Sequence, residues 1–124
     1  MSDSPLILVV DDSPLQRRIY SAALKAEGYT VIVAENGREA VEKALDYDPA
    51  LILMDILMPE MDGLAAVREL RRFREMEAVP ILALTAITDP AEVEEAYRAG
   101  YNDVVDKNSD RAAMLDVVRA WLTG

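Results

Sequence analysis

The sequence predicts an α/β domain in which helices cover both faces of an open, parallel, five-stranded sheet. Short apolar runs alternate five times with segments of helical character, as expected for right-handed βαβ crossovers. The first four runs are apolar on both faces, which is the mark of parallel strands covered by helices on each side. The chain has 124 residues, the length of one ordinary domain, and we expect residues 1–124 to form that domain.

The apolar runs locate the expected strands in chain order. They occupy residues 6–10, 30–34, 50–54, 80–84 and 103–105. The fifth run is short and its neighbours are polar, which is typical of a strand at the edge of a sheet.

Local signals mark where the helices between these runs begin and end. A capping residue followed by proline or glycine opens the first four: Ser13-Pro14, Asn36-Gly37, Asp62-Gly63 and Asp89-Pro90. Asn108 or Ser109 would cap the last helix, and Gly28 and Gly100 would end the first and the fourth. Apolar spacing predicts buried faces for the first and last helices: Leu15, Ile19, Ala22, Ala23 and Ala26, and Met114, Val117, Val118, Trp121 and Leu122.

Composition excludes several kinds of chemistry. The chain has no cysteine and no histidine, which rules out disulfides, Cys or His zinc ligands, and imidazole acid–base catalysis. Its net charge of -10 repels nucleic acid, and we expect no direct binding of DNA or RNA. The first apolar run is too short to span a bilayer and no basic segment precedes it, so we expect a cytoplasmic protein without a membrane segment.

Polar side chains stand at the ends of four predicted strands. Asp11 and Asp12 follow the first strand, Asp55 the third and Thr85 the fourth, and Lys107 lies two residues past the fifth. Ligands of open α/β sheets bind beyond the carboxyl ends of the strands. We therefore expect these five side chains to converge on one rim.

Three converging carboxylates favour a bound cation. Asp11, Asp12 and Asp55 would raise one another's pKa unless a positive charge neutralises them. Capping of the following turns is the alternative explanation, but it suits one aspartate better than three. An oxygen-rich, nitrogen-poor cluster suits a hard divalent ion such as Mg²⁺. A carboxylate beside a metal, an ammonium and a hydroxyl can receive a phosphoryl group, with Asp55 as the nucleophile.

At these residues the sequence resembles the receiver domain of two-component response regulators. The matching segments are 8–13, 53–63, 84–86 and 98–100, together with Lys107. The resemblance implies a flavodoxin-like (βα)5 doubly wound fold with strand order 2-1-3-4-5. It also implies Mg²⁺ bound by Asp12, Asp55 and the main-chain carbonyl of Leu57, with Asp11 contacting the ion through water.

The resemblance further implies how the site works. Asp55 would accept a phosphoryl group from a phosphohistidine on a sensor histidine kinase or a histidine phosphotransfer protein. Lys107 would pair with the phosphoryl oxygens, and Thr85 would move toward them. The chain would then signal through altered contacts with a downstream effector protein, as a monomer or weak homodimer. It would be no enzyme beyond catalysing its own phosphorylation and dephosphorylation.

The sequence departs from the family pattern around the lysine. Val104 stands where the family often has a tyrosine or phenylalanine that switches with the threonine. Tyr101, just upstream, would cover the sheet edge or take over that switch. Leu57 and Ile87 flank the site with apolar side chains that cannot orient an attacking water, so we expect slow self-dephosphorylation.

Other functions fit the residues less well. A haloacid dehalogenase-type phosphohydrolase needs an aspartate two residues after its nucleophile, where this chain has Leu57. A flavin or nucleotide binder needs a phosphate loop after the first strand, where this chain has two carboxylates. A degenerate receiver that docks partners without phosphorylation remains the alternative.

Several charged and polar residues are assigned to the surface. Gln16, Arg17 and Arg18 would border a partner-docking surface around Leu15. Solvated positions are expected for Asp106 and for two sets of helix residues: Arg68, Arg71, Arg72 and Arg74, and Glu92, Glu94 and Glu95.

Overall fold

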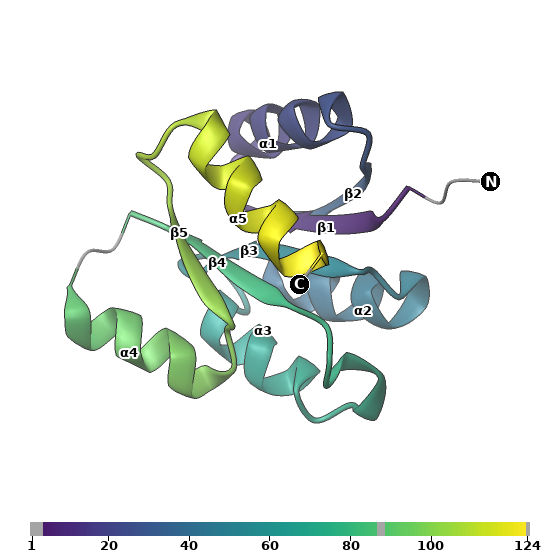
Figure 1. Ribbon diagram of the computed structural model, residues 1–124. Helices are drawn as coiled ribbons and strands as arrows, with labels where there is room; N and C mark the ends of the chain where they lie inside the picture. The colour runs from purple at the N-terminus through teal and green to yellow at the C-terminus, as the bar shows by residue number, and fades with distance from the viewer. Residues whose placement is uncertain (1–3, 87–88, 124) are drawn as a thin grey trace.

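Five parallel strands form a single sheet in the order β2-β1-β3-β4-β5. The computed structural model describes residues 4–86 and 89–123 (Figure 1). The strands are β1 (Leu6–Val10), β2 (Thr30–Ala34), β3 (Leu51–Asp55), β4 (Ile81–Thr85) and β5 (Asp103–Asp106). This topology confirms the fold class and the strand order expected from the sequence.

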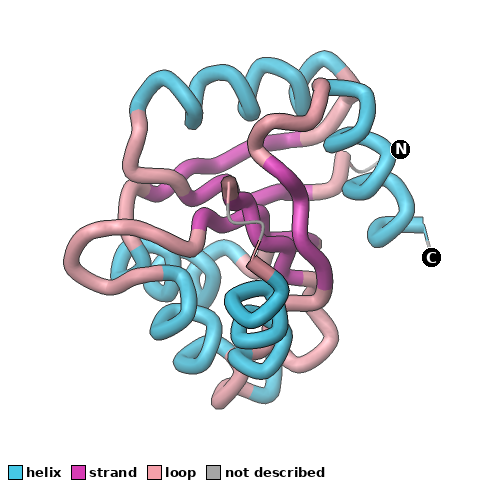
Figure 2. Tube along the Cα trace, turned by 90° about the vertical axis from the view of Figure 1, so that its left-hand side faces the viewer, coloured by secondary structure: helices cyan, strands magenta, loops and turns pink. Residues whose placement is uncertain are grey.

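Helices cover both faces of the sheet. One face carries α1 (Pro14–Ala26) and α5 (Arg111–Thr123), and the other carries α2 (Gly37–Tyr47), α3 (Gly63–Leu70) and α4 (Pro90–Ala99) (Figures 1 and 2). A short 3₁₀ helix, η1 (Arg74–Met76), lies between α3 and β4. Among the described residues, no helix is long and apolar enough to cross a membrane.

The two-sided covering explains why the strands are apolar at every position. In β1, Leu8 and Val10 belong to the core under α2, α3 and α4, whereas Ile7 and Val9 belong to the core under α1 and α5. All four side chains are fully buried. Successive side chains of a strand point to opposite faces, so a strand between two helical layers buries both sets.

The predicted helix caps form, with one exception. The side chains of Ser13, Asn36, Asp62 and Asp89 each accept a hydrogen bond from a main-chain N–H in the first turn of the helix that follows. The last helix differs, because Asp110 caps α5 through a 2.8 Å bond from the Ala113 N–H. Asn108 and Ser109, the predicted caps, instead donate hydrogen bonds to Asp106 in the preceding turn.

The buried face of α1 is not the one predicted. Tyr20, Ala23 and Leu24 pack against the sheet, whereas Leu15 and Ile19 are 62% and 50% exposed. Of the five predicted core residues in this helix, only Ala23 is buried. In α5 the prediction is closer, since Met114 and Val118 are buried and Val117 and Leu122 are partly buried, while Trp121 lies at the surface.

Arg71 also differs from its predicted place on a solvated helix face. Because α3 ends at Leu70, the guanidinium folds inward and donates hydrogen bonds to the main-chain carbonyls of Met76, Val79 and Gly100 at 2.6, 2.9 and 3.0 Å. It also donates to the side-chain oxygen of Asn102. Burial lowers the pKa of Arg71 from its ordinary value.

The other members of the predicted solvated sets behave as expected. Exposed positions are occupied by Arg68, Arg72, Arg74, Glu92, Glu94, Glu95 and Asp106. Arg71 is thus the exception, and it joins η1, the approach to β4 and the loop between α4 and β5.

Candidate functional site

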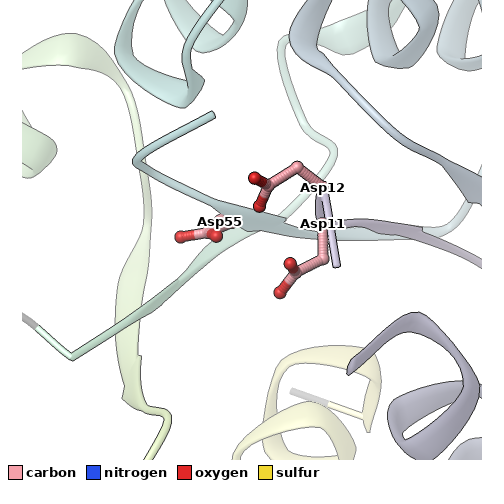
Figure 3. Close-up of side chains that lie close together, drawn as sticks. All are labelled: Asp11, Asp12 and Asp55. Atoms are coloured by element: carbon pink, nitrogen blue, oxygen red, sulfur yellow. The ribbon is translucent and has the colours of Figure 1, made fainter. Parts of the chain in front are cut away.

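The three predicted metal-binding aspartates meet at the carboxyl end of the sheet. Strands β1 and β3 are neighbours and Val10 pairs with Met54, so the residues that follow, Asp11 and Asp55, lie side by side. One carboxylate oxygen from each of Asp11, Asp12 and Asp55 lies within 4.8 Å of the other two (Figure 3). The strand order therefore produces the convergence that the sequence predicts.

The three carboxylates differ in their surroundings. Asp11 is fully buried, and its Oδ1 accepts a 3.0 Å hydrogen bond from the Ser13 N–H. Asp55 is 5% exposed, and its Oδ1 accepts a 3.4 Å bond from the Leu57 N–H. Asp12 is exposed. The cluster is consequently closed on the Asp11 side and open to solvent at Asp12.

Lys107 brings the cationic group to this cluster. Its Nζ lies 2.9 Å from Asp55 Oδ2 and 3.1 Å from Asp11 Oδ2. Burial alone would lower the pKa of Lys107, but its hydrogen bonds and charge interactions with Asp55 and Asp11 raise it above the ordinary value. The lysine is therefore charged at neutral pH, and it contacts both buried carboxylates at once.

Burial dominates the electrostatics of Asp55. It raises the pKa of Asp55, the hydrogen bond and charge of Lys107 oppose that rise, and the charge of Asp11 adds to it. One ammonium faces three carboxylates, which leaves negative charge to be neutralised when all three are ionised.

The cluster fits a hard divalent cation. The buried Asp11 Oδ2 has the Lys107 ammonium as its ion-pair partner at 3.1 Å, and no other described residue donates a hydrogen bond to it, so it can also accept one from metal-bound water. The donor set consists of oxygens, the ligands that Mg²⁺ prefers, and the open Asp12 side gives room for metal-bound water.

Thr85 and Leu57 complete the set of predicted site residues. Thr85 ends β4 and is 3% exposed, and its main-chain carbonyl accepts a 3.0 Å hydrogen bond from the Lys107 N–H. Leu57 lies in the loop after β3 with its side chain 67% exposed. Ile87, predicted to flank the site, lies outside the described residues. Each described member of the set is thus at the carboxyl rim of the sheet.

Arg17 is closer to the site than the sequence suggested. Its Nη1 donates a 2.7 Å hydrogen bond to the main-chain carbonyl of Asp11, and its Nη2 lies 3.9 Å from Glu35. Its side chain is 18% exposed. Arg17 therefore supports the loop between β1 and α1 in addition to bordering the exposed apolar residues of α1.

Tyr101 was expected to cover the sheet edge or to act as a switch, and the structure places it inside the molecule. The side chain is 3% exposed, and its hydroxyl donates a 3.3 Å hydrogen bond to the main-chain carbonyl of Asp55. Tyr101 is therefore a buried core residue, and its role as a switch stays a prediction. Val104 is partly buried against the same core.

Comparison with known proteins agrees with this geometry. A family model described as "Response regulator receiver domain" matches residues 7–119. The chain is 35% identical to Protein PilH of Pseudomonas aeruginosa over 118 residues, which cover 95% of this chain and 98% of PilH.

Solved receiver structures are also similar. The chemotaxis protein CheY4 of Vibrio cholerae has a TM-score of 0.92 at 32% identity, covering 97% of this chain and 100% of that one. The receiver domain of the sensor histidine kinase PA1611 from Pseudomonas aeruginosa PAO1 has a TM-score of 0.92 at 34% identity, covering 98% and 100%. That structure has a magnesium ion coordinated in its active site cleft. The chain therefore belongs to the response regulator receiver domain family of two-component signalling.

Proposed function

We propose that this receiver takes a phosphoryl group from a phosphohistidine onto Asp55 in a Mg²⁺-dependent reaction. The donor would be a sensor histidine kinase or a histidine phosphotransfer protein. The observation that carries the proposal is the position of Lys107 Nζ, 2.9 Å from Asp55 Oδ2, within a cluster of three carboxylates. The phosphorylated receiver would signal by changing its contacts with an effector protein.

The chemistry is a transfer from nitrogen to oxygen. A carboxylate oxygen of Asp55 forms a bond to phosphorus as the bond between phosphorus and the donor imidazole breaks, and the electron pair of that bond leaves with the imidazole. Lys107 balances charge on the phosphoryl oxygens, and the Thr85 hydroxyl donates a hydrogen bond to one of them.

The metal would be held by the residues that already cluster. Asp12, Asp55 and the main-chain carbonyl of Leu57 would bind Mg²⁺ directly, and Asp11 would do so through water. The ion would supply positive charge beside the transferring oxygens. The fit rests on the oxygen donor set and on three carboxylates that share one neighbouring ammonium among the described residues.

The surface around the site suits a transient protein partner. Leu15, Ile19 and Leu57 are exposed large apolar side chains, and α1 begins three residues after Asp11. A hollow of about 330 Å³ opens between α1 and α5 next to Lys107. We assign the kinase or phosphotransfer partner to this surface, because its phosphohistidine must reach Asp55.

Intact-mass measurement tests the proposed function. With Mg²⁺ and acetyl phosphate, the protein is expected to gain one phosphoryl group, because this small donor needs no partner protein. EDTA and the substitution Asp55→Asn should each abolish the gain.

An exposed aspartate provides the matched control for this measurement. Asp46 lies on α2 with its side chain in solvent, so Asp46→Asn should be phosphorylated like the wild type. If Asp55→Asn still gains the phosphoryl group, another residue is the acceptor. An absence of adduct in the wild type at every Mg²⁺ concentration would favour a receiver that docks partners without phosphorylation.

The lifetime of the phosphoryl group is a second expectation for this site. Leu57 presents an apolar, exposed side chain beside Asp55 and cannot orient a water. Leu57→Asn supplies an amide that can, and we expect loss of phosphate to become about tenfold faster. That gain is below the range for general-base catalysis, since an amide does not take the proton. Leu15→Asn, at an equally exposed leucine, should leave the lifetime unchanged. Equal decay in the two variants would contradict the expectation.

A further inference from the structure

We propose that Tyr101 is a positioning residue for phosphoryl transfer: its hydroxyl, bound to the main-chain carbonyl of Asp55, holds the acceptor aspartate in its reactive orientation. The inference rests on the proposed role of Asp55 and adds to it a residue from the loop between α4 and β5. Tyr101 lies 46 positions from Asp55 in the sequence, and the two meet at 3.3 Å.

The contact between the Tyr101 hydroxyl and the Asp55 carbonyl is closely packed against the start of α3. A Cβ atom on Gly63 would lie 2.2 Å from the Asp55 carbonyl oxygen, 2.2 Å from the Tyr101 hydroxyl and 2.8 Å from Ile56 Cα. Real Cβ atoms do not approach other atoms so closely, so only glycine allows α3 to begin here. The hydroxyl, the carbonyl and the first residue of α3 therefore hold one another in place.

The main chain after Asp55 is fixed from two directions. Tyr101 donates to the carbonyl of Asp55, and the Gly63 N–H donates a 2.7 Å hydrogen bond to the carbonyl of Ile56. The same stretch of chain provides the Leu57 N–H that contacts Asp55 Oδ1. The orientation of these peptides thus sets both the Asp55 side chain and the loop that continues to Leu57.

Tyr101 is itself anchored at its other end. Its N–H donates a 3.2 Å hydrogen bond to the carbonyl of Ala96 in α4, and the next N–H, from Asn102, bonds to Ile81 at the start of β4. The ring lies in the core under α2, α3 and α4. A tyrosine ring has few rotatable bonds, so the side chain forms a stiff connection from the end of α4 to the acceptor.

The hydroxyl keeps its proton over the working pH range. Burial raises the pKa of Tyr101 well above its ordinary value, and the negative charge of Asp55 adds to this. A neutral tyrosine hydroxyl is a donor, as the bond to the carbonyl requires. Among its described contacts, the one to Asp55 is with the main chain, so the carboxylate remains available to the metal and the phosphoryl group.

Tyr101→Phe separates positioning from packing, because phenylalanine keeps the ring and removes only the hydroxyl. Phosphorylation by acetyl phosphate should be followed by intact mass at several donor concentrations. We expect the rate at saturating donor to fall about tenfold while the donor concentration for half-maximal rate stays the same, since misorientation affects the reacting atom more than donor binding. If Tyr101 served only in packing, Tyr101→Phe would lower the melting temperature but would leave the phosphorylation rate unchanged at temperatures below unfolding.

Tyr97→Phe is the matched control. It also removes one tyrosine hydroxyl, whose 3.4 Å hydrogen bond goes to Asp103 on the surface and away from Asp55. This variant should react at the wild-type rate. If Tyr101→Phe reacts within twofold of the wild type, the inference is overturned while the proposed function stands.

A measurement on the unphosphorylated protein tests the role of Tyr101 separately from the proposed phosphorylation of Asp55. In the unphosphorylated protein, the amide NMR resonances of Ile56 and Leu57 should shift and broaden in Tyr101→Phe and stay unchanged in Tyr97→Phe. Unchanged resonances in Tyr101→Phe would overturn the inference even if the wild type never accepts phosphate.

Discussion

Replacing Lys107 by alanine is expected to slow phosphorylation of Asp55 by about 100-fold or more, the usual cost of removing one donor from developing negative charge. In the structure the ammonium contacts Asp55 Oδ2 at 2.9 Å and Asp11 Oδ2 at 3.1 Å. During transfer the ammonium would contact the phosphoryl oxygens, where negative charge develops. No other lysine or arginine of the described chain forms an ion pair with the site carboxylates. The rate of mass gain with acetyl phosphate at fixed Mg²⁺ measures the effect.

Two further variants test whether the loss of phosphorylation rate in Lys107→Ala is specific to this lysine. Lys25→Ala removes an exposed lysine in the last turn of α1 and should not change the rate. Lys107→Arg retains the charge but replaces a compact ammonium with a planar, larger group, so we expect partial recovery. A wild-type rate in Lys107→Ala would remove the lysine from the mechanism, whatever the behaviour of Asp55→Asn.

Replacing Arg71 by methionine is expected to lower the free energy of unfolding by about 3 kcal/mol, because several buried acceptors lose their donor together. The methionine retains much of the apolar stem but none of the hydrogen bonds to Met76, Val79 and Gly100. The guanidinium is only half buried, so water replaces part of what is lost. Urea unfolding followed by circular dichroism measures the change.

The neighbouring arginine supplies the comparison for Arg71. Arg72 lies two residues past the end of α3, with a 77% exposed side chain and a 3.6 Å ion pair to Glu69 in that helix. Such surface pairs contribute less than about 1 kcal/mol. Arg72→Met should therefore unfold close to the wild-type midpoint. Equal midpoints for the two variants would show that the inward bonds of Arg71 add nothing to stability.

The sheet and the site rim could be predicted because both follow from local pattern. Apolar runs of strand length locate the strands, and the residue after each run lies at the carboxyl end of a parallel strand. Asp11 and Asp55 are therefore at the same rim, whatever the details of packing. Their contact also requires β1 and β3 to be neighbours, which the resemblance to receivers implied and the structure shows.

The predictions for the buried face of α1 and the cap of α5 were wrong because the sequence allows more than one local structure at each place. Helix α1 has two apolar stripes, one with Leu15 and Ile19 and one with Tyr20 and Leu24. Spacing alone does not say which of them the sheet covers, because that depends on how the helix lies on β1 and on α5. The cap of α5 is a similar case: three successive polar residues could serve, and the turn at Asp106 takes two of them.

The contacts of Arg71 and Tyr101 could not be predicted from sequence for a different reason. Both bind main-chain carbonyls, and a carbonyl is present at every residue and leaves no trace in the sequence. Tyr101 meets Asp55 across 46 positions of the chain, and Arg71 meets Gly100 across 29 positions. A tyrosine directly after Gly100 was the hint that the sequence offered, and it did not specify the acceptor.

The position of β1 in the sheet has a consequence for how the protein forms during synthesis. This strand precedes the other four strands in the chain but lies between β2 and β3, with all of its last four residues buried. One edge of β1 stays unpaired until residues 51–55 have been made, and the pairing of β1 with β3 closes a long loop, which costs conformational entropy. We therefore expect the nascent chain to be most prone to aggregation before β3 emerges, while this edge of β1 is unpaired.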